Sequence, residues 1–301
     1  MHASLEADMG DQSALRPKTA VGPALRASAA AILADARAAV SDSERSSADA
    51  VHAFRRAMKQ WRALIRLLEP LVDDAARLRR EARDHARALA SARDGQSALN
   101  ALDDLVQDGL TLSPRTVASI RGRLEALRES GEHAVLTAAV RERIIGWLDA
   151  AAAAVDGWQL DAVRFDAIAA RLTVGYRSAR RHIPDDWSQA SGTDLHELRR
   201  RVVDHRYQMD LVAPLWPRFG RMWMEEAERV RDRLGRFQDL EVLERLAEPH
   251  QPLAPWRSRL TPSCSERKAK LAHRACRIVS RLFAERPKAF GRRLEALWEN
   301  G

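Results

Sequence analysis

The feature that most limits the possible folds is a helical stretch that occurs twice. Residues 51–71 (VHAFRRAMKQWRALIRLLEPL) and 195–215 (LHELRRRVVDHRYQMDLVAPL) match at seven of 21 positions without a gap. The matches pair His52 with His196 and Arg55 with Arg199. Composition alone does not produce a repeated pattern of this length, so it indicates that one helical unit is present twice in the chain.

The repeat continues beyond this stretch. With one inserted residue, 89–102 (LASARDGQSALNAL) matches 234–246 (LGRFQDLEVLERL), which aligns Asp94 with Asp239. Apolar residues recur at helical spacing, and alternating β-branched runs are absent. We therefore predict an all-α fold of two pseudo-symmetric four-helix bundles from an internal duplication, the first half about 23–156 and the second about 157–301.

The helix boundaries are predicted from the helical spacing of apolar residues and from the Gly- and Pro-containing segments that interrupt it. Residues 1–22 predict a disordered N-terminal tail that precedes a domain over 23–301. Thr193 or Asp194 is the predicted N-cap of the helix at 194–213. Glu197, three residues after Asp194, would complete a capping box. Helices are predicted at 24–40, 47–69, 71–92, 95–107, 114–129, 132–155, 160–182, 194–213, 217–236, 238–247, 263–284 and 287–299.

The first copy of the repeat carries two stripes at helical spacing. One stripe is apolar and predicts the face toward the core: Val51, Phe54, Met58, Trp61, Ile65 and Leu68. The other lies about 100° around the helix and is cationic: His52, Arg55, Lys59, Arg62 and Arg66. Like charges at this spacing repel by a few tenths of a kcal/mol per pair. Retention of such a stripe in both copies suggests an anion supplied from outside.

Arginine suits an anion site because its guanidinium donates two parallel hydrogen bonds to phosphate oxygens, and histidine adds a further donor. Residues 176–184 form a third basic cluster that leads toward the second copy. The alternative is pairing with the protein's own carboxylates, such as Asp94, Asp239, Glu81 or Glu225. The predicted binding residues are His52, Arg55, Arg56, Lys59, Arg62, Arg66, Arg177, Arg180, Arg181, His196, Arg199, Arg200 and Arg206.

Composition narrows the function classes. A formal net charge of +8 and a pI of about 10.2 favour a polyanionic partner. Cys264 and Cys276 are the only cysteines, so neither a disulfide framework nor a metal site is predicted. Residues 1–22 lack the apolar core of a signal peptide, and the apolar run 148–158 is too short to span a membrane. We expect a cytoplasmic protein without a cofactor.

These residues resemble the CHAD (conserved histidine α-helical) domain. The resemblance rests on His52, Arg55, Lys59 and Arg62, on the second copy (His196, Arg199, Arg206, Tyr207), and on the ARD and LGRFQD elements, and it covers roughly 24–300. It implies two four-helix bundles about a pseudo-twofold axis and a basic pore or groove that binds inorganic polyphosphate. Members can localise to polyphosphate granules, whose other proteins are possible partners. Some members carry a triphosphate-tunnel domain; this sequence shows no Glu-x-Glu-x-Lys strand and is similar to a stand-alone member.

The sequence departs from the family pattern at several points. The second copy has Val203 where a basic residue is typical and places Asp204 next to it. The first copy has Gln60 where another Arg often stands, and Ala90 replaces the glycine of the LGxxRD element. We therefore expect the first half to contribute more to binding.

Three other function classes fit the sequence less well. A nucleic-acid backbone binder is the main alternative, although no helix-turn-helix spacing or zinc finger is present. An enzyme is not predicted, because no Gly-rich phosphate loop, HExxH or GxSxG motif occurs. A membrane-surface protein is not predicted either, because the bundle uses the apolar stripe beside the basic one.

Overall fold

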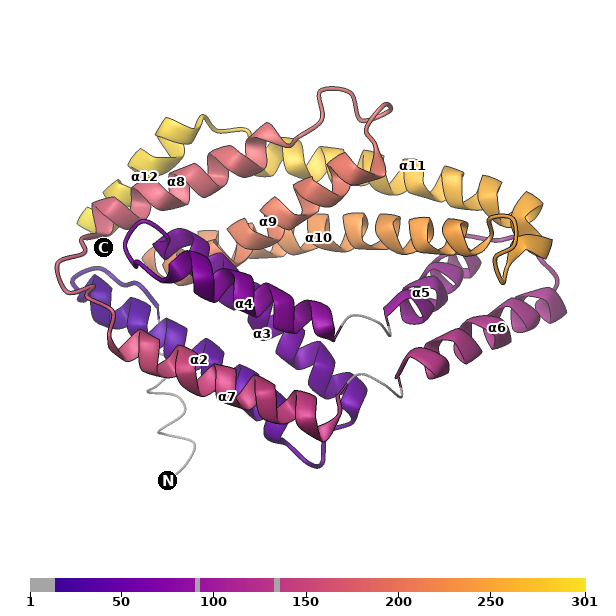
Figure 1. Ribbon diagram of the computed structural model, residues 1–301. Coiled ribbons are helices and arrows are strands. Elements are labelled where there is room, and N and C mark those ends of the chain that lie inside the picture. Colours follow the sequence, from indigo (N-terminus) through magenta and orange to yellow (C-terminus); the bar gives the residue numbers. More distant parts are fainter. Residues whose placement is uncertain (1–13, 90–92, 133–135) are drawn as a thin grey trace.

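Helices form almost everywhere that the periodicity predicts them (Figure 1). The computed structural model describes residues 14–89, 93–132 and 136–301. No described residue lies in a strand, so the all-α prediction is confirmed. The helices are α2 (Val21–Ser41), α3 (Ser47–Leu68), α4 (Ala75–Ala88), α5 (Arg93–Gln107), α6 (Pro114–Glu132), α7 (Ala138–Asp156), α8 (Phe165–Arg181), α9 (Gly192–Val212), α10 (Pro217–Leu246), α11 (Arg257–Leu282) and α12 (Pro287–Glu299). Short 3₁₀ turns span Ala213–Leu215 and Ala254–Trp256.

The N-terminal boundary differs from the prediction. Helix α2 begins at Val21, and Leu15 is buried with its N–H donating to the carbonyl of Leu211 at 2.8 Å. The last part of the predicted tail over 1–22 is therefore packed, because one apolar side chain and one backbone hydrogen bond fix it on α9. Residues 1–13 lie outside the described part of the chain.

Two helix boundaries of the second half also differ. The N-cap of α9 is Ser191, whose hydroxyl accepts from the Asp194 N–H while the Asp194 carboxylate accepts from the Ser191 N–H. The capping box thus lies three residues before the predicted one. Helix α10 is continuous where a break near 237 was predicted, because apolar positions such as Val230, Leu234 and Leu240 continue the buried face through that point.

Helix α3 forms the centre of the main core. Phe54, Met58, Trp61, Ile65 and Leu68 are all fully buried, which confirms the predicted apolar stripe apart from the partly buried Val51. The Trp61 ring stacks on Trp158 with centroids 6.1 Å apart. Each such side chain contributes about 1.5–3 kcal/mol on burial. This burial fixes the rotation of α3 about its axis and so places the cationic stripe beside the core.

The helix contacts of the two halves follow the same order. Helix α2 packs on α3 and α7, as α8 packs on α9 and α12. The single helix α10 corresponds to α4 and α5 together. It packs on α9 and α11, as α4 packs on α3 and α5 packs on α6. The two repeat helices, α3 and α9, pack against each other. The arrangement agrees with the order of the repeat, while the duplication itself remains a prediction.

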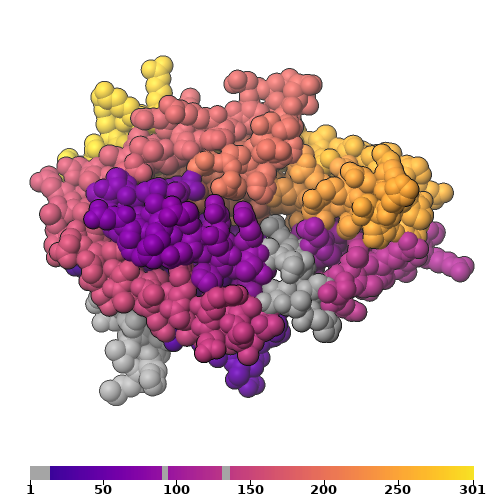
Figure 2. Space-filling model, viewed as in Figure 1, coloured from indigo at the N-terminus to yellow at the C-terminus, as the bar shows by residue number. Residues whose placement is uncertain are grey.

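The two halves share apolar clusters. A second apolar cluster joins α5 and α6 of the first half to α10 and α11 of the second, through side chains such as Leu102, Leu124, Leu243 and Leu260. In Figure 1 this lobe projects to one side, and in Figure 2 its α6 and α11 lie apart from α4 and α7. The long helix α10 contributes side chains to both apolar clusters, and the predicted boundary between the halves at residues 156–157 stays a prediction.

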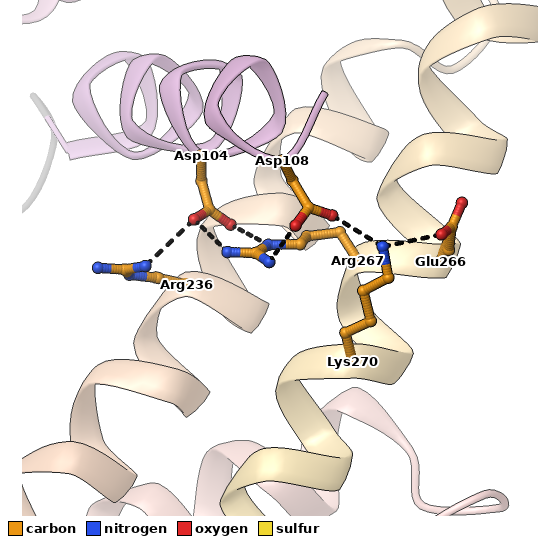
Figure 3. A network of polar contacts seen from close by, with 6 residues as sticks. All are labelled: Asp104, Asp108, Arg236, Glu266, Arg267 and Lys270. Atoms are coloured by element: carbon orange, nitrogen blue, oxygen red, sulfur yellow. Dashed lines mark hydrogen bonds and ion pairs between the residues drawn. The ribbon is translucent and has the colours of Figure 1, made fainter. Parts of the chain in front are cut away.

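A buried ionic network links α5 to α11 within this lobe (Figure 3). The Asp104 carboxylate accepts from Nε and Nη2 of Arg267, both at 2.7 Å, and from Arg236 at 3.3 Å. Arg267 also donates to Asp108 at 2.7 Å. The hydrogen bond that Arg267 donates to Asp104 raises the pKa of Arg267, and the one that Lys270 donates to Asp108 lowers the pKa of Asp108. The geometry is bidentate and water is largely excluded, so the pair orients α5 on α11.

The part of the chain that the structure describes contains no candidate membrane-spanning helix and no cluster of metal ligands. No helix there is long and apolar enough to cross a membrane. No group of three or more His, Cys, Asp or Glu side chains within them is placed to hold a metal ion. Both cysteines are free, and burial raises the pKa of the Cys264 thiol to about 12.

The network predicts a large cost for single truncation. Asp104→Ala leaves the buried guanidinium of Arg267 without its main partner, so we expect a loss of about 3–5 kcal/mol in the free energy of unfolding, measured with urea. The double variant Asp104→Leu/Arg267→Met removes both charges and is expected to recover most of that loss. A loss below about 1 kcal/mol for Asp104→Ala would show that the pair does not hold the lobe together.

Candidate anion-binding site

The cationic row of α3, defined as His52, Arg55, Arg56, Lys59, Arg62 and Arg66, runs from solvent toward the interior. His52, Arg56 and Lys59 are exposed, whereas Arg55, Arg62 and Arg66 are half-buried. Arg56 and Arg62 form no ion pair with any described residue. A helix rises 1.5 Å per residue, so the row is about 21 Å long.

His52 lies in a strongly positive environment. Partial burial lowers its pKa, and Lys59, Arg56, Arg231 and Arg55 lower it further. The imidazole is therefore neutral at neutral pH in the free protein. A bound anion would reverse this effect, because it favours the imidazolium form.

The row ends in a cluster shared by both repeat helices. Arg62 and Arg66 of α3 lie with Arg200 and Arg201 of α9 around the carboxylate of Asp204. Arg66 Nε is 3.4 Å from Asp204 Oδ2, and Asp204 is largely buried, with a side chain 14% exposed. Burial raises the pKa of Asp204, while Arg66 and Arg62 oppose that rise. We call these four arginines the seam cluster.

The seam cluster carries more positive than negative charge. Arg200 and Arg201 both pair with Glu197, each at 2.7 Å. Four guanidiniums thus share two carboxylates, Asp204 and Glu197. Burial lowers the pKa of Arg62 and of Arg66, and the neighbouring arginines act in the same direction. This is an unfavourable arrangement that an added anion would relieve.

Two aligned arginines also tie helices together. Arg55 donates to the carbonyl of Leu89 at the end of α4, at 3.1 Å. Arg199 donates to the carbonyl of Arg231 on α10 at 3.2 Å and to Gln238 Oε1 at 3.3 Å. A Cβ at Gly235 would lie 3.3 Å from this guanidinium, so the glycine of LGRFQD leaves room for it. These arginines therefore have a structural role, whatever they bind.

Ion pairs engage two of the predicted binding arginines in the second copy. Besides the Arg200–Glu197 pair, Arg206 pairs with Glu228 at 2.9 Å and lies over the Tyr207 ring at 5.2 Å. The carboxylates that pair with Arg66, Arg200 and Arg206 are thus Asp204, Glu197 and Glu228.

His196 lies in a different environment from His52. It lines a cleft of about 570 Å³ whose described lining comes from α5, α9 and α10 and includes Asp94, Asp239 and Glu241. Burial raises the pKa of Glu241 there. The aligned histidines therefore occupy surfaces of opposite charge, which the sequence alignment did not reveal.

The third basic cluster does not join the row. Arg180 donates from Nη1 to the carbonyls of Phe283 (2.9 Å), Ala284 (3.1 Å) and Glu285 (2.6 Å), and so caps the end of α11. Arg177 and Arg181 are exposed on α8, and among the described residues no interaction joins either of them to α3.

The structure adds cations that the sequence analysis did not select. Arg201 follows Arg200 directly, and the run 199–201 was a visible signal for it. Arg79 and Arg83 of α4 lie close enough to Arg66 and Arg62 to lower their pKa values. The sequence suggested a salt-bridged face there, and Arg79 does pair with Glu69 at 2.9 Å. Arg231 of α10 reaches His52 and carries no repeat signal.

Comparisons with known proteins agree with this architecture. The CHAD domain family model matches residues 23–248. The crystal structure of the CHAD domain from the plant Ricinus communis is similar over 94% of both chains, with a TM-score of 0.57 and 16% sequence identity, which shows a shared fold. No curated protein sequence matches the chain. Because the family model spans most of the sequence and the fold agrees, the chain belongs to the CHAD domain family.

Proposed function

We propose that the protein binds inorganic polyphosphate along the cationic row of α3 and the seam cluster. The supporting observation is the excess charge: Arg56 and Arg62 have no ion-pair partner among the described residues, and four seam arginines share two carboxylates. Polyphosphate is the anion that the resemblance to CHAD domains implies. Its repeating phosphates match a row of evenly spaced cations better than a single compact anion would.

The row favours a flexible phosphate chain over nucleic acid. Its exposed members offer charge and hydrogen-bond donors, and phosphate contacts of this kind carry no base specificity. The row is bordered by helices rather than presented on one protruding helix, as groove readers require. Nucleic-acid backbone binding is the second candidate, because the same cations attract any polyanion.

The first half is proposed to contribute most of the binding. In α9, Arg206 and Arg200 already pair with glutamates, and Arg199 bonds to α10. In α3, Arg56 and Arg62 are available for a ligand. The protein would then act as a binding protein rather than an enzyme, in the cytoplasm or at polyphosphate granules, with granule proteins as further partners.

Competition at two salt concentrations tests the proposal. Polyphosphates of graded length, duplex DNA and heparin are titrated at equal charge equivalents. We expect polyphosphate to bind most tightly, with log affinity falling linearly with log salt as counterions are released. Displacement of polyphosphate by an equal charge of duplex DNA would favour the nucleic-acid alternative.

Removal of three cations of the row, two exposed and one half-buried, should abolish most of the binding. In Arg56→Gln/Lys59→Gln/Arg62→Gln we expect an affinity loss of about 100-fold and a salt slope reduced by about two, because each lost contact removes roughly 0.7 from the slope. Helicity by circular dichroism should be unchanged. The matched control Arg115→Gln/Arg164→Gln/Arg257→Gln removes three exposed charges elsewhere and should keep near-normal affinity; equal losses in both would show that only net charge matters.

His52 should make the binding pH-dependent. Its pKa is lowered in the free protein, and a bound anion raises it, so binding takes up a proton and affinity rises as the pH falls through the range below 6.5. We expect a several-fold gain between about pH 7.5 and 5.5, measured by fluorescence anisotropy with labelled polyphosphate. His52→Gln should flatten that profile. An unchanged profile in the variant would place His52 outside the binding site.

A further inference from the structure

A small cavity lies where the cationic row ends. Helices α3, α8 and α9 enclose a space of about 120 Å³, lined by Arg66, Arg171 and Asp204 among others. A water molecule takes about 30 Å³, so the space holds about four waters or one phosphate-sized oxyanion. Val174, which is exposed, also lines it, so the cavity reaches the surface beside α8.

Three arginines bring unused donors to this cavity. The Nε atoms of Arg171 and Arg201 are buried without a hydrogen-bond partner in the described structure, and Arg66 Nε, also buried, makes no hydrogen bond although it lies 3.4 Å from Asp204 Oδ2 in an ion pair. Their terminal nitrogens are engaged elsewhere: Arg201 pairs with Glu197, and Arg171 donates weakly to the carbonyl of Arg66 at 3.4 Å. A buried N–H without a partner is costly, so such donors indicate a ligand or ordered water.

His205 supplies a fourth donor. The indole N–H of Trp223 can only donate, and it lies 3.1 Å from His205 Nε2, so that nitrogen accepts. Burial lowers the His205 pKa to about 3, which keeps the ring neutral with its proton on Nδ1. The Nδ1–H is buried, lacks a partner in the described residues, and belongs to a side chain that lines the cavity.

The cavity also holds acceptors. Gln208 donates through Nε2 to the carbonyl of Ala63 at 3.1 Å, which leaves Oε1 buried and without a donor among the described residues. A Cβ at Gly175 would lie 2.5 Å from this Oε1, so the glycine is required for the Gln208 position. The carboxylate of Asp204 lines the same space. Acceptors in a cationic cavity disfavour a fully deprotonated anion.

We propose that this cavity binds one protonated phosphoryl group, either free orthophosphate or the end of a polyphosphate chain. Such a group accepts hydrogen bonds from the four donors and donates its own proton to Gln208 or Asp204. Sulfate is fully deprotonated near neutral pH and has no proton to donate. The internal phosphates of a chain lack that proton as well. The donor and acceptor set therefore distinguishes a monohydrogen phosphate from both.

The cavity continues the binding row. Arg66 is the last cation of the α3 row and lines the cavity, so a chain bound along α3 would place its end there. In this chain-end form the inference rests on the proposed polyphosphate binding. In the orthophosphate form it stands alone.

Calorimetry with orthophosphate and sulfate at matched ionic strength tests the cavity directly. We expect at least tenfold preference for phosphate, lost in Arg171→Gln and retained in Arg164→Gln, which removes one exposed charge from the start of the same helix. Asp204→Asn should bring the ratio close to one, because an amide can donate to sulfate. Equal weak binding of both anions to the unmodified protein would mean that the cavity holds water only, and would overturn the proposal.

Phosphorus NMR of tripolyphosphate separates the chain end from free phosphate. The terminal resonance should broaden before the central one at substoichiometric protein, and Arg171→Gln should remove that difference. Equal broadening of both resonances would reject the chain-end form. If the protein binds long chains but does not prefer orthophosphate to sulfate, the cavity proposal is wrong and binding along the row stands. If the protein prefers orthophosphate but does not bind long chains, the cavity proposal stands and the proposed polyphosphate binding is wrong.

Discussion

The packing of two cationic helices against each other is the constraint on which the rest of the structure depends. Helices α3 and α9 bring Arg62, Arg66, Arg200 and Arg201 around one buried carboxylate, that of Asp204. At an effective dielectric constant near 20, a pair of like charges 4 Å apart repels by about 4 kcal/mol. The apolar side of α3, including Trp61 and Phe54, offsets this repulsion because its burial requires that rotation of the helix. The charge arrangement is therefore a consequence of the core.

This origin explains why the cations are ordered before any ligand binds. Guanidiniums held by neighbours, such as Arg66 by Asp204 and Arg55 by the Leu89 carbonyl, lose little side-chain entropy on binding. Exposed cations such as Arg56 and Lys59 give attraction but lose more entropy. Under the proposed polyphosphate binding, the exposed cations of the row would attract the chain and the half-buried ones would fix its position at the inner end.

The sequence predicted the helices and the apolar stripe well because both depend on local spacing. The burial of Met58 and Ile65 follows directly from their three- and four-residue intervals. The partners of the cations could not be predicted in this way. Arg180 caps α11 across about 100 residues, and Arg206 pairs with Glu228 of the next helix, contacts that periodicity does not specify. His52 and His196 align in sequence, yet His196 lines a cleft whose carboxylates come from α5 and α10. The alignment does not show which helices surround each histidine.

The two copies differ at one position that matters for their packing against each other. Asp204 aligns with Gln60, so the second copy supplies the seam with the carboxylate that the first copy lacks. Without a carboxylate at that position, four arginines would meet with Glu197 alone, and the two helices could not pack so closely. With more carboxylates, no excess charge would remain for an anion. A single buried acid from one copy therefore allows the helices to pack while leaving the α3 row positive, and this requires that the two copies differ.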